Sequence, residues 1–219
     1  MMCGRFALYS SVNAIMAYAD RLAADDAPSY NITPGSSILT ISRDGDSRIL
    51  KRRIWGLVPF WAKDKKIGTR LINARSESLT DKPSFKYAFQ KRRCLVVADG
   101  FFEWRERDKQ PFYIVGKGLL FFAGLWERWT QPDGTPLETT AIITTPANAT
   151  MEPLHHRMPV ILDAEQAQLW LHPSPSWIAL HSLLESTAMS LSMHPVSKEI
   201  NSPANNHPGL LEEVNMGLF

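Results

Sequence analysis

Apolar and polar residues alternate along several short segments of the chain, and this period of two predicts β-strands. Two such segments, 38–41 and 48–55, flank Asp44-Gly45, a pair that favours a tight hairpin turn. The other segments predicted as strands are 72–77, 94–98, 101–105, 112–115, 119–125, 139–145, 159–162 and 189–194. The pattern therefore predicts a protein built mainly of short strands.

A helical period is found in fewer places. It follows Ser11, a residue suited to cap a helix, and its apolar positions are Val12, Ile15, Met16, Ala19 and Leu22. Two more helices are predicted over 163–171, where Asp163 can cap the first turn, and over 176–186. Because strands and helices do not alternate regularly, we predict an α+β fold with a mostly antiparallel β-sheet flanked by a few helices.

The composition predicts a single domain over residues 1–219. A chain of 219 residues that is 44% hydrophobic can bury a sizeable core, and no repeat or linker divides it, although 202–208 looks irregular. Two cysteines cannot build a disulfide framework, which favours a reducing compartment. No apolar run suits a signal peptide or approaches the roughly 20 residues of a membrane span. We therefore expect a cytoplasmic protein without a membrane partner.

The net charge of +2 says little about partners, but basic residues cluster at 48–53, 63–70 and 91–93. Such clusters can follow a phosphate backbone, or they can simply form solvated faces. The second cluster follows an aromatic segment, 55–61, that ends in Phe60-Trp61. Aromatic rings beside lysines are typical of single-strand binding, in which bases stack on the rings. Packing of the tryptophans in the core is the alternative.

Cys3 lies almost at the amino terminus, after two methionines. If both methionines are removed, Cys3 carries a free α-amine beside its thiol. The amine can condense with an aldehyde, and the thiol can then close on the same carbon to give a stable thiazolidine ring. Both groups are partly nucleophilic near neutral pH. A near-terminal cysteine without a role is the alternative.

Two further segments carry candidate polar chemistry. Asn73, Arg75 and Glu77 share one face of the predicted strand 72–77, where they can bind a phosphate-bearing ligand or remain an exposed polar face. Glu103 lies among aromatic residues, and partial burial there would raise its pKa, as a general acid–base requires. A surface glutamate at a sheet edge is the alternative.

The remaining candidates are two histidines and the second cysteine. His155 and His156 are adjacent, and neighbours on an extended chain point apart, so we predict a poor metal pair. One of them can serve as an acid–base group, with a structural role as the alternative. Cys94 is predicted to be a buried, unreactive thiol.

Seven short segments occur in the order they have in one known family. They are 3–6, 30–34, 55–59, 73–77, 98–104, 155–159 and 194–197. Together they resemble the SRAP family, which is named for SOS-response-associated peptidases and is associated with abasic-site DNA–protein crosslinks. The resemblance covers nearly the whole chain and implies a barrel-like sheet core.

The resemblance also implies an activity and its catalytic residues. Cys3 corresponds to the nucleophile that traps the ring-opened abasic sugar as a thiazolidine crosslink. Asn73 corresponds to the residue that positions this terminus and the sugar, and Glu103 to the acid–base residue. His155 corresponds to the histidine that handles the sugar oxygen and crosslink reversal. No metal or organic cofactor is implied.

The partner implied by the resemblance is single-stranded DNA with an abasic site, or a junction of single and double strands. Arg5 and Arg75 correspond to phosphate-binding arginines, and Asn31 is a further site member. Phe60 and Trp61 fall where the family presents an aromatic wedge to the flanking bases. We expect a monomer that acts during the DNA damage response.

One departure from the family pattern concerns the terminus. The pattern begins Met-Cys, whereas here Met1 and Met2 both precede Cys3, so either translation starts at Met2 or the chain is cut after Met2. Self-cleavage would fit the peptidase label. Two other classes remain open: a cysteine peptidase or amino-terminal-nucleophile amidohydrolase, and a non-catalytic module that binds single-stranded or modified DNA.

Overall fold

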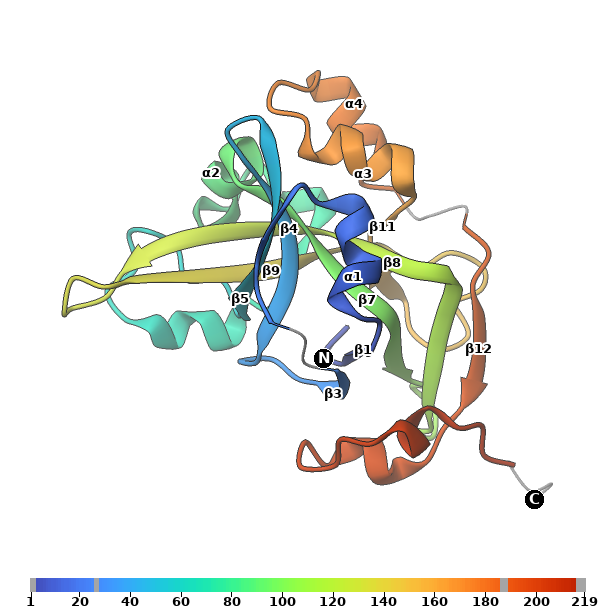
Figure 1. The fold of residues 1–219 in the computed structure, drawn as a ribbon. Coiled ribbons are helices and arrows are strands. Elements are labelled where there is room, and N and C mark those ends of the chain that lie inside the picture. The colour runs from blue at the N-terminus through green and yellow to red at the C-terminus, as the bar shows by residue number, and fades with distance from the viewer. Residues whose placement is uncertain (1–2, 26–27, 186–188, 216–219) are drawn as a thin grey trace.

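The computed structural model describes residues 3–25, 28–185 and 189–215, which form one twelve-stranded sheet with short helices around it (Figure 1). The strands are β1 Phe6–Leu8, β2 Arg21–Ala23, β3 Ser29–Ile32, β4 Ser37–Asp44, β5 Ser47–Trp55, β6 Asn73–Arg75, β7 Arg93–Trp104, β8 Pro111–Thr130, β9 Pro136–Pro146, β10 Arg157–Pro159, β11 Ile161–Leu162 and β12 Ser192–Pro195. The α-helices are α1 Val12–Ile15, α2 Pro83–Lys91, α3 Ala164–Leu171 and α4 Trp177–Ser182. The 3-10 helices are η1 Met16–Tyr18, η2 Lys65–Arg70, η3 Ser76–Ser78, η4 Lys198–Asn201 and η5 Pro208–Leu211. Within the described ranges, no helix is long and apolar enough to cross a bilayer.

The sheet closes into a ring because β7 pairs with β4 on one side and with β8 on the other. The ring runs β8, β9, β5, β4, β7 and back to β8. Three pairings, β2 with β5, β5 with β9 and β6 with β9, are parallel, and the other strand pairings are antiparallel. The predicted α+β class and the barrel-like, mostly antiparallel core are confirmed.

The two longest strands, β7 and β8, each join two segments that were predicted as separate strands. In β7 the register shifts between Ala98 and Gly100, and such a bulge lets a strand bend while its pairing continues. Gly100 is required there, because a Cβ atom would lie 2.5 Å from the phenol ring of Tyr113. The Asp-Gly and Gly-Lys-Gly sequences therefore bend these strands without ending them.

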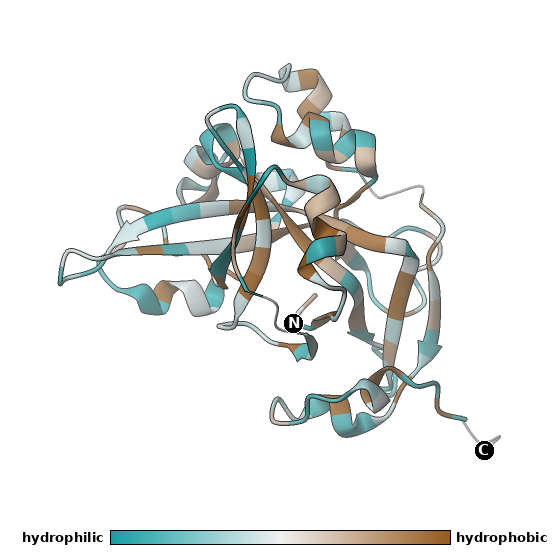
Figure 2. Ribbon diagram, in the orientation of Figure 1, coloured by the Kyte–Doolittle hydropathy of each residue, from teal (hydrophilic) through white to brown (hydrophobic). Residues whose placement is uncertain are grey.

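Apolar side chains from the ring of strands fill its interior. Figure 2 shows hydrophobic residues concentrated along the crossing strands β4, β7 and β8. Phe6 packs against Trp55, with ring centroids 5.3 Å apart, and against Phe122. The Trp55 indole donates a hydrogen bond to the Ile72 carbonyl at 2.9 Å, so its one polar atom is satisfied. For this tryptophan, core packing is confirmed.

The predicted hairpin and the helix cap at Asp163 are confirmed. Strands β4 and β5 meet with Asp44 opposite Ser47, and Asp163 forms a capping box with Gln166 at the start of α3. Helix α4 is shorter than the predicted 176–186, whose last residue lies outside the described ranges. Helix α2 was not predicted, although it begins with Pro83, a residue favoured in a first turn, and buries one apolar face.

The first predicted helix is wrong in its second half. Ser11 caps α1 as expected, but the helix tightens into η1 and ends at Tyr18. Asp20 accepts hydrogen bonds from the backbone and side chain of Arg48, which holds the following residues as β2 beside β5. Leu22 is consequently 51% exposed in place of the predicted buried position. An ion pair between residues that are distant in the sequence decided the structure there.

The predicted strand 72–77 is also too long. Strand β6 ends at Arg75 and the chain turns into η3, so Glu77 does not share a strand face with Asn73 and Arg75. The Arg157 guanidinium donates to both carboxylate oxygens of Glu77 and draws it away from that face. This pair lowers the pKa of Glu77 to about 2.

The carboxyl-terminal segment is irregular over most of 202–208, as predicted, but it is firmly anchored. Ile200 and Leu210 are fully buried in a small second core with Phe102 and Val196. Figure 1 shows this segment, in red, beneath the end of β12. It therefore forms part of the domain and does not behave as a loose tail.

The backbones of Gly56 and Gly68 touch, which fixes η2 against the sheet. A Cβ atom on Gly68 would lie 2.6 Å from the Gly56 carbonyl oxygen. We expect Gly68→Ala to lower the free energy of unfolding by about 2 kcal/mol through overpacking, measured by chemical denaturation. Gly118→Ala is the control, because its Cβ would meet no described atom within 4 Å and its φ of +79° alone costs about 1 kcal/mol. Equal losses in the two variants would contradict the close approach.

Candidate functional site

A polar pocket of about 630 Å³ opens where the start of β1, the end of β7 and the loop before β10 meet. Its lining residues are Gly4, Arg5, Glu103, Trp104, Glu106, Lys109 and His155. Cys3 adjoins it, because the Cys3 backbone N–H donates to Glu103 Oε2 at 3.1 Å. The pocket thus brings together four residues predicted from sequence: Cys3, Arg5, Glu103 and His155.

Strand pairing explains why Cys3 and Glu103 meet although they are far apart in sequence. Phe6 on β1 lies opposite Phe101 on β7, and the Phe102 N–H donates to the Arg5 carbonyl. Extending both chains from this register brings Cys3 beside Glu103. The Cys3 backbone has a φ of +37°, which is unfavourable for a residue with a Cβ atom.

Cys3 is deeply buried, at 1% exposure. Burial raises the pKa of its thiol well above the ordinary value, and the neighbouring Glu103 carboxylate raises it further. The thiol is therefore neutral at physiological pH in the described chain. Cys94 is also buried, and burial raises its pKa to about 11, in agreement with the predicted unreactive thiol.

Glu103 is only 3% exposed, which excludes the surface alternative. On β7 it shares a face with Phe101, while Phe102 contributes to the second core on the opposite face. Burial raises the pKa of Glu103 to about 7, although hydrogen bonds from the Cys3 and Trp104 N–H groups partly oppose the rise. A carboxyl group with this pKa can both accept and donate a proton near neutral pH.

His155 is held by the turn that precedes β10. The backbone N–H of His155 donates to the Met151 carbonyl, and the ring Nδ1 of His155 accepts a hydrogen bond from the Arg157 backbone N–H at 3.1 Å. The neutral ring therefore carries its proton on Nε2. Burial and the neighbouring His156 lower the pKa of His155, which favours this neutral form.

Arg5 and Asn31 form one hydrogen-bonded unit with the carboxyl-terminal segment. Arg5 Nη1 donates to Asn31 Oδ1 at 2.6 Å and to the Ile200 carbonyl at 2.5 Å. Asn31 Nδ2 in turn donates to the carbonyls of Ser202 and Asn205. Asn31 is buried and acts here by holding Arg5. The indole of Trp104 adds a bond to Asn201.

Asn73 and Arg75 lie on β6, which pairs with β9 through Ile142 and Thr144. Strand β10 pairs with the same end of β9, and Arg157 on β10 donates to the Thr144 carbonyl. Arg75 is exposed on this edge. Residues from β6 and β10 thus converge on one end of β9.

Phe60 and Trp61 are exposed by 53% and 47%, in contrast to the buried Trp55. Phe60 contacts Tyr87 of α2 at 5.4 Å between ring centroids, and Tyr87 is itself 42% exposed. Phe60 therefore forms an exposed aromatic pair with Tyr87, and Trp61 follows it in the chain. Sequence reasoning missed Tyr87 because α2 was not predicted.

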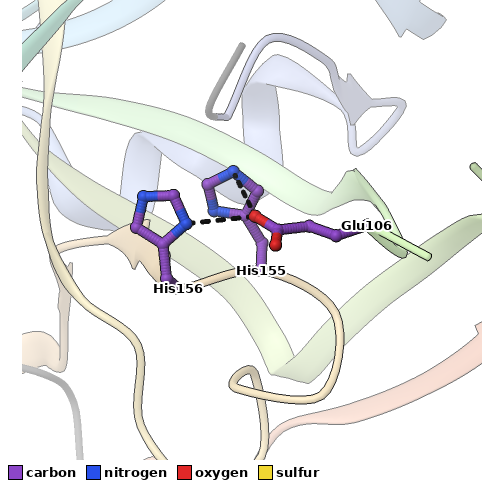
Figure 3. A group of neighbouring side chains, drawn as sticks. All are labelled: Glu106, His155 and His156. Carbon is purple, nitrogen blue, oxygen red and sulfur yellow. Dashed lines mark hydrogen bonds and ion pairs between the residues drawn. The ribbon is translucent and has the colours of Figure 1, made fainter.

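The prediction that His155 and His156 point apart is wrong. Their rings stack with centroids 4.3 Å apart, because both residues lie in the bend before β10 and not on a strand (Figure 3). Glu106 reaches both rings (Figure 3). Glu106 and Lys109 were missed at the sequence level, since only the turn between β7 and β8 brings them to the pocket.

Solved structures of other proteins share this fold. A solved structure of a protein from Bacteroides thetaiotaomicron superposes with a TM-score of 0.87, at 26% identity, covering 97% of this chain and all of that one. The solved structure of a phage-related protein from Bordetella bronchiseptica has a TM-score of 0.71 at 32% identity, covering 90% of this chain and 95% of that one. The closed sheet is thus an established architecture.

The family model described as "SOS response associated peptidase (SRAP)" matches residues 2–203. Abasic site processing protein YoqW of Bacillus subtilis (strain 168) is 45% identical, covering 96% of this chain and 99% of its own. Abasic site processing protein HMCES of Gallus gallus is 34% identical, covering 99% of this chain and 79% of its own. The chain belongs to the SRAP family.

The raised pKa of Glu103 predicts how stability depends on pH. Between pH 4.5 and about 7 the folded state holds a proton on Glu103 that the unfolded state has lost, so stability falls as the pH rises through this window. The full rise corresponds to roughly 3 kcal/mol above pH 7. We expect Glu103→Gln to be more stable than the parent at pH 8 and similar at pH 4, measured by thermal unfolding.

Glu106→Gln is the control for this measurement. Glu106 is exposed, and its hydrogen bond with His156 lowers its pKa, so the Glu103 signature should be absent from this variant. If Glu103→Gln gives no added stability at pH 8, the buried carboxyl does not have the raised pKa described above.

Proposed function

We propose that this chain senses abasic sites in DNA and captures them covalently through Cys3, once Cys3 is the first residue. The observation that carries the proposal is the 3.1 Å contact between the Cys3 backbone nitrogen and the buried Glu103 carboxylate, beside a polar pocket. Family membership and relatives named abasic site processing proteins support it.

Glu103 is placed to activate the amine. When the residues before Cys3 are lost, the nitrogen that now donates to Glu103 becomes an α-amine, with an ordinary pKa of about 7.7–8.0. Glu103, with a pKa raised to about 7, accepts a proton from the ammonium form and leaves a neutral nucleophile. The same carboxyl group can then return the proton to a departing oxygen.

The capture consumes no oxidant and needs no cofactor. The amine adds to the aldehyde of the ring-opened sugar, and the loss of one water gives an imine. The Cys3 thiol then adds across the C=N bond: sulfur bonds to the carbon and the thiol proton ends on nitrogen. His155 supports the sugar, because its Nε2–H is the donor that faces the pocket. Asn73 completes the proposed catalytic set.

The proposed partner is single-stranded DNA, or a junction of single and double strands, bound by a monomer. Arg5 at the pocket and the exposed Arg75 are proposed to hold phosphates, with Asn31 fixing Arg5. Phe60 and Trp61 are proposed to stack on flanking bases. We propose that the protein acts in the cytoplasm, on the damaged chromosome.

Self-cleavage before Cys3 is proposed as the route to the reactive terminus when translation starts at Met1. The cleavage consumes one water, whose oxygen adds to the carbonyl carbon of the bond to be cut. The peptide nitrogen of that bond lies beside Glu103, which can protonate it as it leaves. The φ of +37° at Cys3 adds strain next to that bond, which its cleavage would release.

The test is the intact mass of the purified protein before and after incubation with a single-stranded oligonucleotide carrying one abasic site. We expect a mass that begins at Cys3, then an adduct that survives denaturation. Cys3→Ala should abolish the adduct. Cys94→Ala, which removes the other cysteine, should retain it. A protein that begins at Cys3 and forms no adduct would contradict the proposal. If both methionines remain on the purified protein, the measurement is repeated with a chain that starts at Met2.

The aromatic and phosphate contacts predict different salt behaviour. Trp61→Ala should weaken binding of an undamaged single strand by about 1–3 kcal/mol without changing the slope of log K against log salt. Arg75→Ala should reduce that slope by about one contact. Trp177→Ala, an exposed tryptophan on α4, is the control and should change neither quantity. The binding affinity and its salt slope are measured for each variant by fluorescence anisotropy across a salt series.

A further inference from the structure

Glu106, His155 and His156 bring three metal-ligating side chains together (Figure 3). Two of them, Glu106 and His155, line the polar pocket. Glu106 Oε1 lies 3.1 Å from His156 Nδ1 and 3.6 Å from His155 Nε2. The three ligand atoms all lie within 4.8 Å of one another. Two imidazoles and one carboxylate are a donor set that zinc uses in catalytic sites.

The spacing of these atoms suits one tetrahedral ion. Zinc bonds to nitrogen and carboxylate oxygen of about 2.0–2.2 Å place neighbouring ligand atoms roughly 3.3–3.5 Å apart. The two oxygen–nitrogen separations of 3.1 and 3.6 Å lie on either side of that value. The two imidazole rings are stacked in the metal-free protein, so both must rotate for their nitrogens to converge on an ion with Glu106 Oε1.

The cluster is also accessible to an ion from solvent. The side chains of Glu106 and His156 are 56% and 67% exposed, while His155, at 10%, faces inward. A fourth position on the ion would open toward the pocket that Glu106 and His155 line. We propose that Glu106, His155 and His156 bind a single Zn²⁺ ion reversibly, and that the bound ion inhibits the reaction at Cys3.

The hydrogen bonding of His155 makes this site reversible and inhibitory. His155 Nδ1 accepts the Arg157 N–H, so Nε2 carries the ring proton in the metal-free protein. When zinc binds Nε2, the ring proton must move to Nδ1. A protonated Nδ1 can no longer accept the hydrogen bond from the Arg157 N–H. The ion therefore competes with a formed hydrogen bond. It also occupies the atom through which His155 would donate to the sugar, a consequence that rests on the proposed function.

Binding is measured first without DNA, with Co²⁺ as a coloured substitute and zinc as competitor. Cys3→Ala is the parent protein, so that the terminal thiol cannot contribute. We expect one visible-absorbing Co²⁺ site per chain that zinc displaces. His156→Ala should weaken zinc binding by more than the roughly 10- to 100-fold that loss of an outer-shell partner costs. His207→Ala is the matched control, because His207 Nε2 lies 3.8 Å from Glu199 and the pair belongs to no group of three such ligands among the described residues.

Inhibition is then measured as the rate of crosslinking with and without zinc, each variant being compared with its own rate in chelator. Zinc should slow the protein with an intact cluster and lose potency in His156→Ala. Equal zinc affinity in His156→Ala and its parent, or no saturable Co²⁺ site, would overturn the inference. A failure to crosslink even in chelator would instead contradict the proposed function and leave the metal titration standing.

Discussion

The burial of Glu103 against the Cys3 backbone nitrogen is the contact on which the candidate site depends. A carboxyl group that is 3% exposed is costly to ionise, and the hydrogen bonds from the Cys3 and Trp104 N–H groups partly offset that cost. The protein maintains this arrangement through the pairing of β1 with β7, which is part of the closed sheet. Stability is thereby exchanged for an acid–base group poised near neutral pH.

The ring of strands holds this contact rigidly. The carboxyl-terminal segment fixes the neighbouring Arg5 side chain. Arg5 directly precedes β1, and its guanidinium donates a hydrogen bond to the Ile200 carbonyl. Asn31 on β3 donates hydrogen bonds to three carbonyls of the same segment. Residues separated by almost the whole chain thus fix one guanidinium. A change in this irregular segment would be felt at the pocket through Arg5, without altering a residue that lines it.

The sequence predicted the fold class, the hairpin and the cap at Asp163 because each depends on local pattern. It failed where a long-range pair decided the structure: Asp20 with Arg48 converted the end of a helix into β2, and Arg157 drew Glu77 off the β6 face. Of the residues that the resemblance implied, the structure gathers Cys3, Arg5, Glu103 and His155 at the pocket. Glu106 and Lys109 belong to none of the motifs that carry the resemblance. They reach the pocket only because the turn between β7 and β8 places them there.

Under the proposed function, removal of the residues before Cys3 would change the site in a way that couples processing to reactivity. The φ of +37° exists only while a peptide precedes Cys3, so cleavage releases that strain. The Cys3 nitrogen, which donates to Glu103 as an amide, would become an amine that can attack an aldehyde. The amide-bound form keeps its thiol neutral and buried. Under the proposed chemistry, the unprocessed chain is therefore protected from aldehydes until its terminus is exposed.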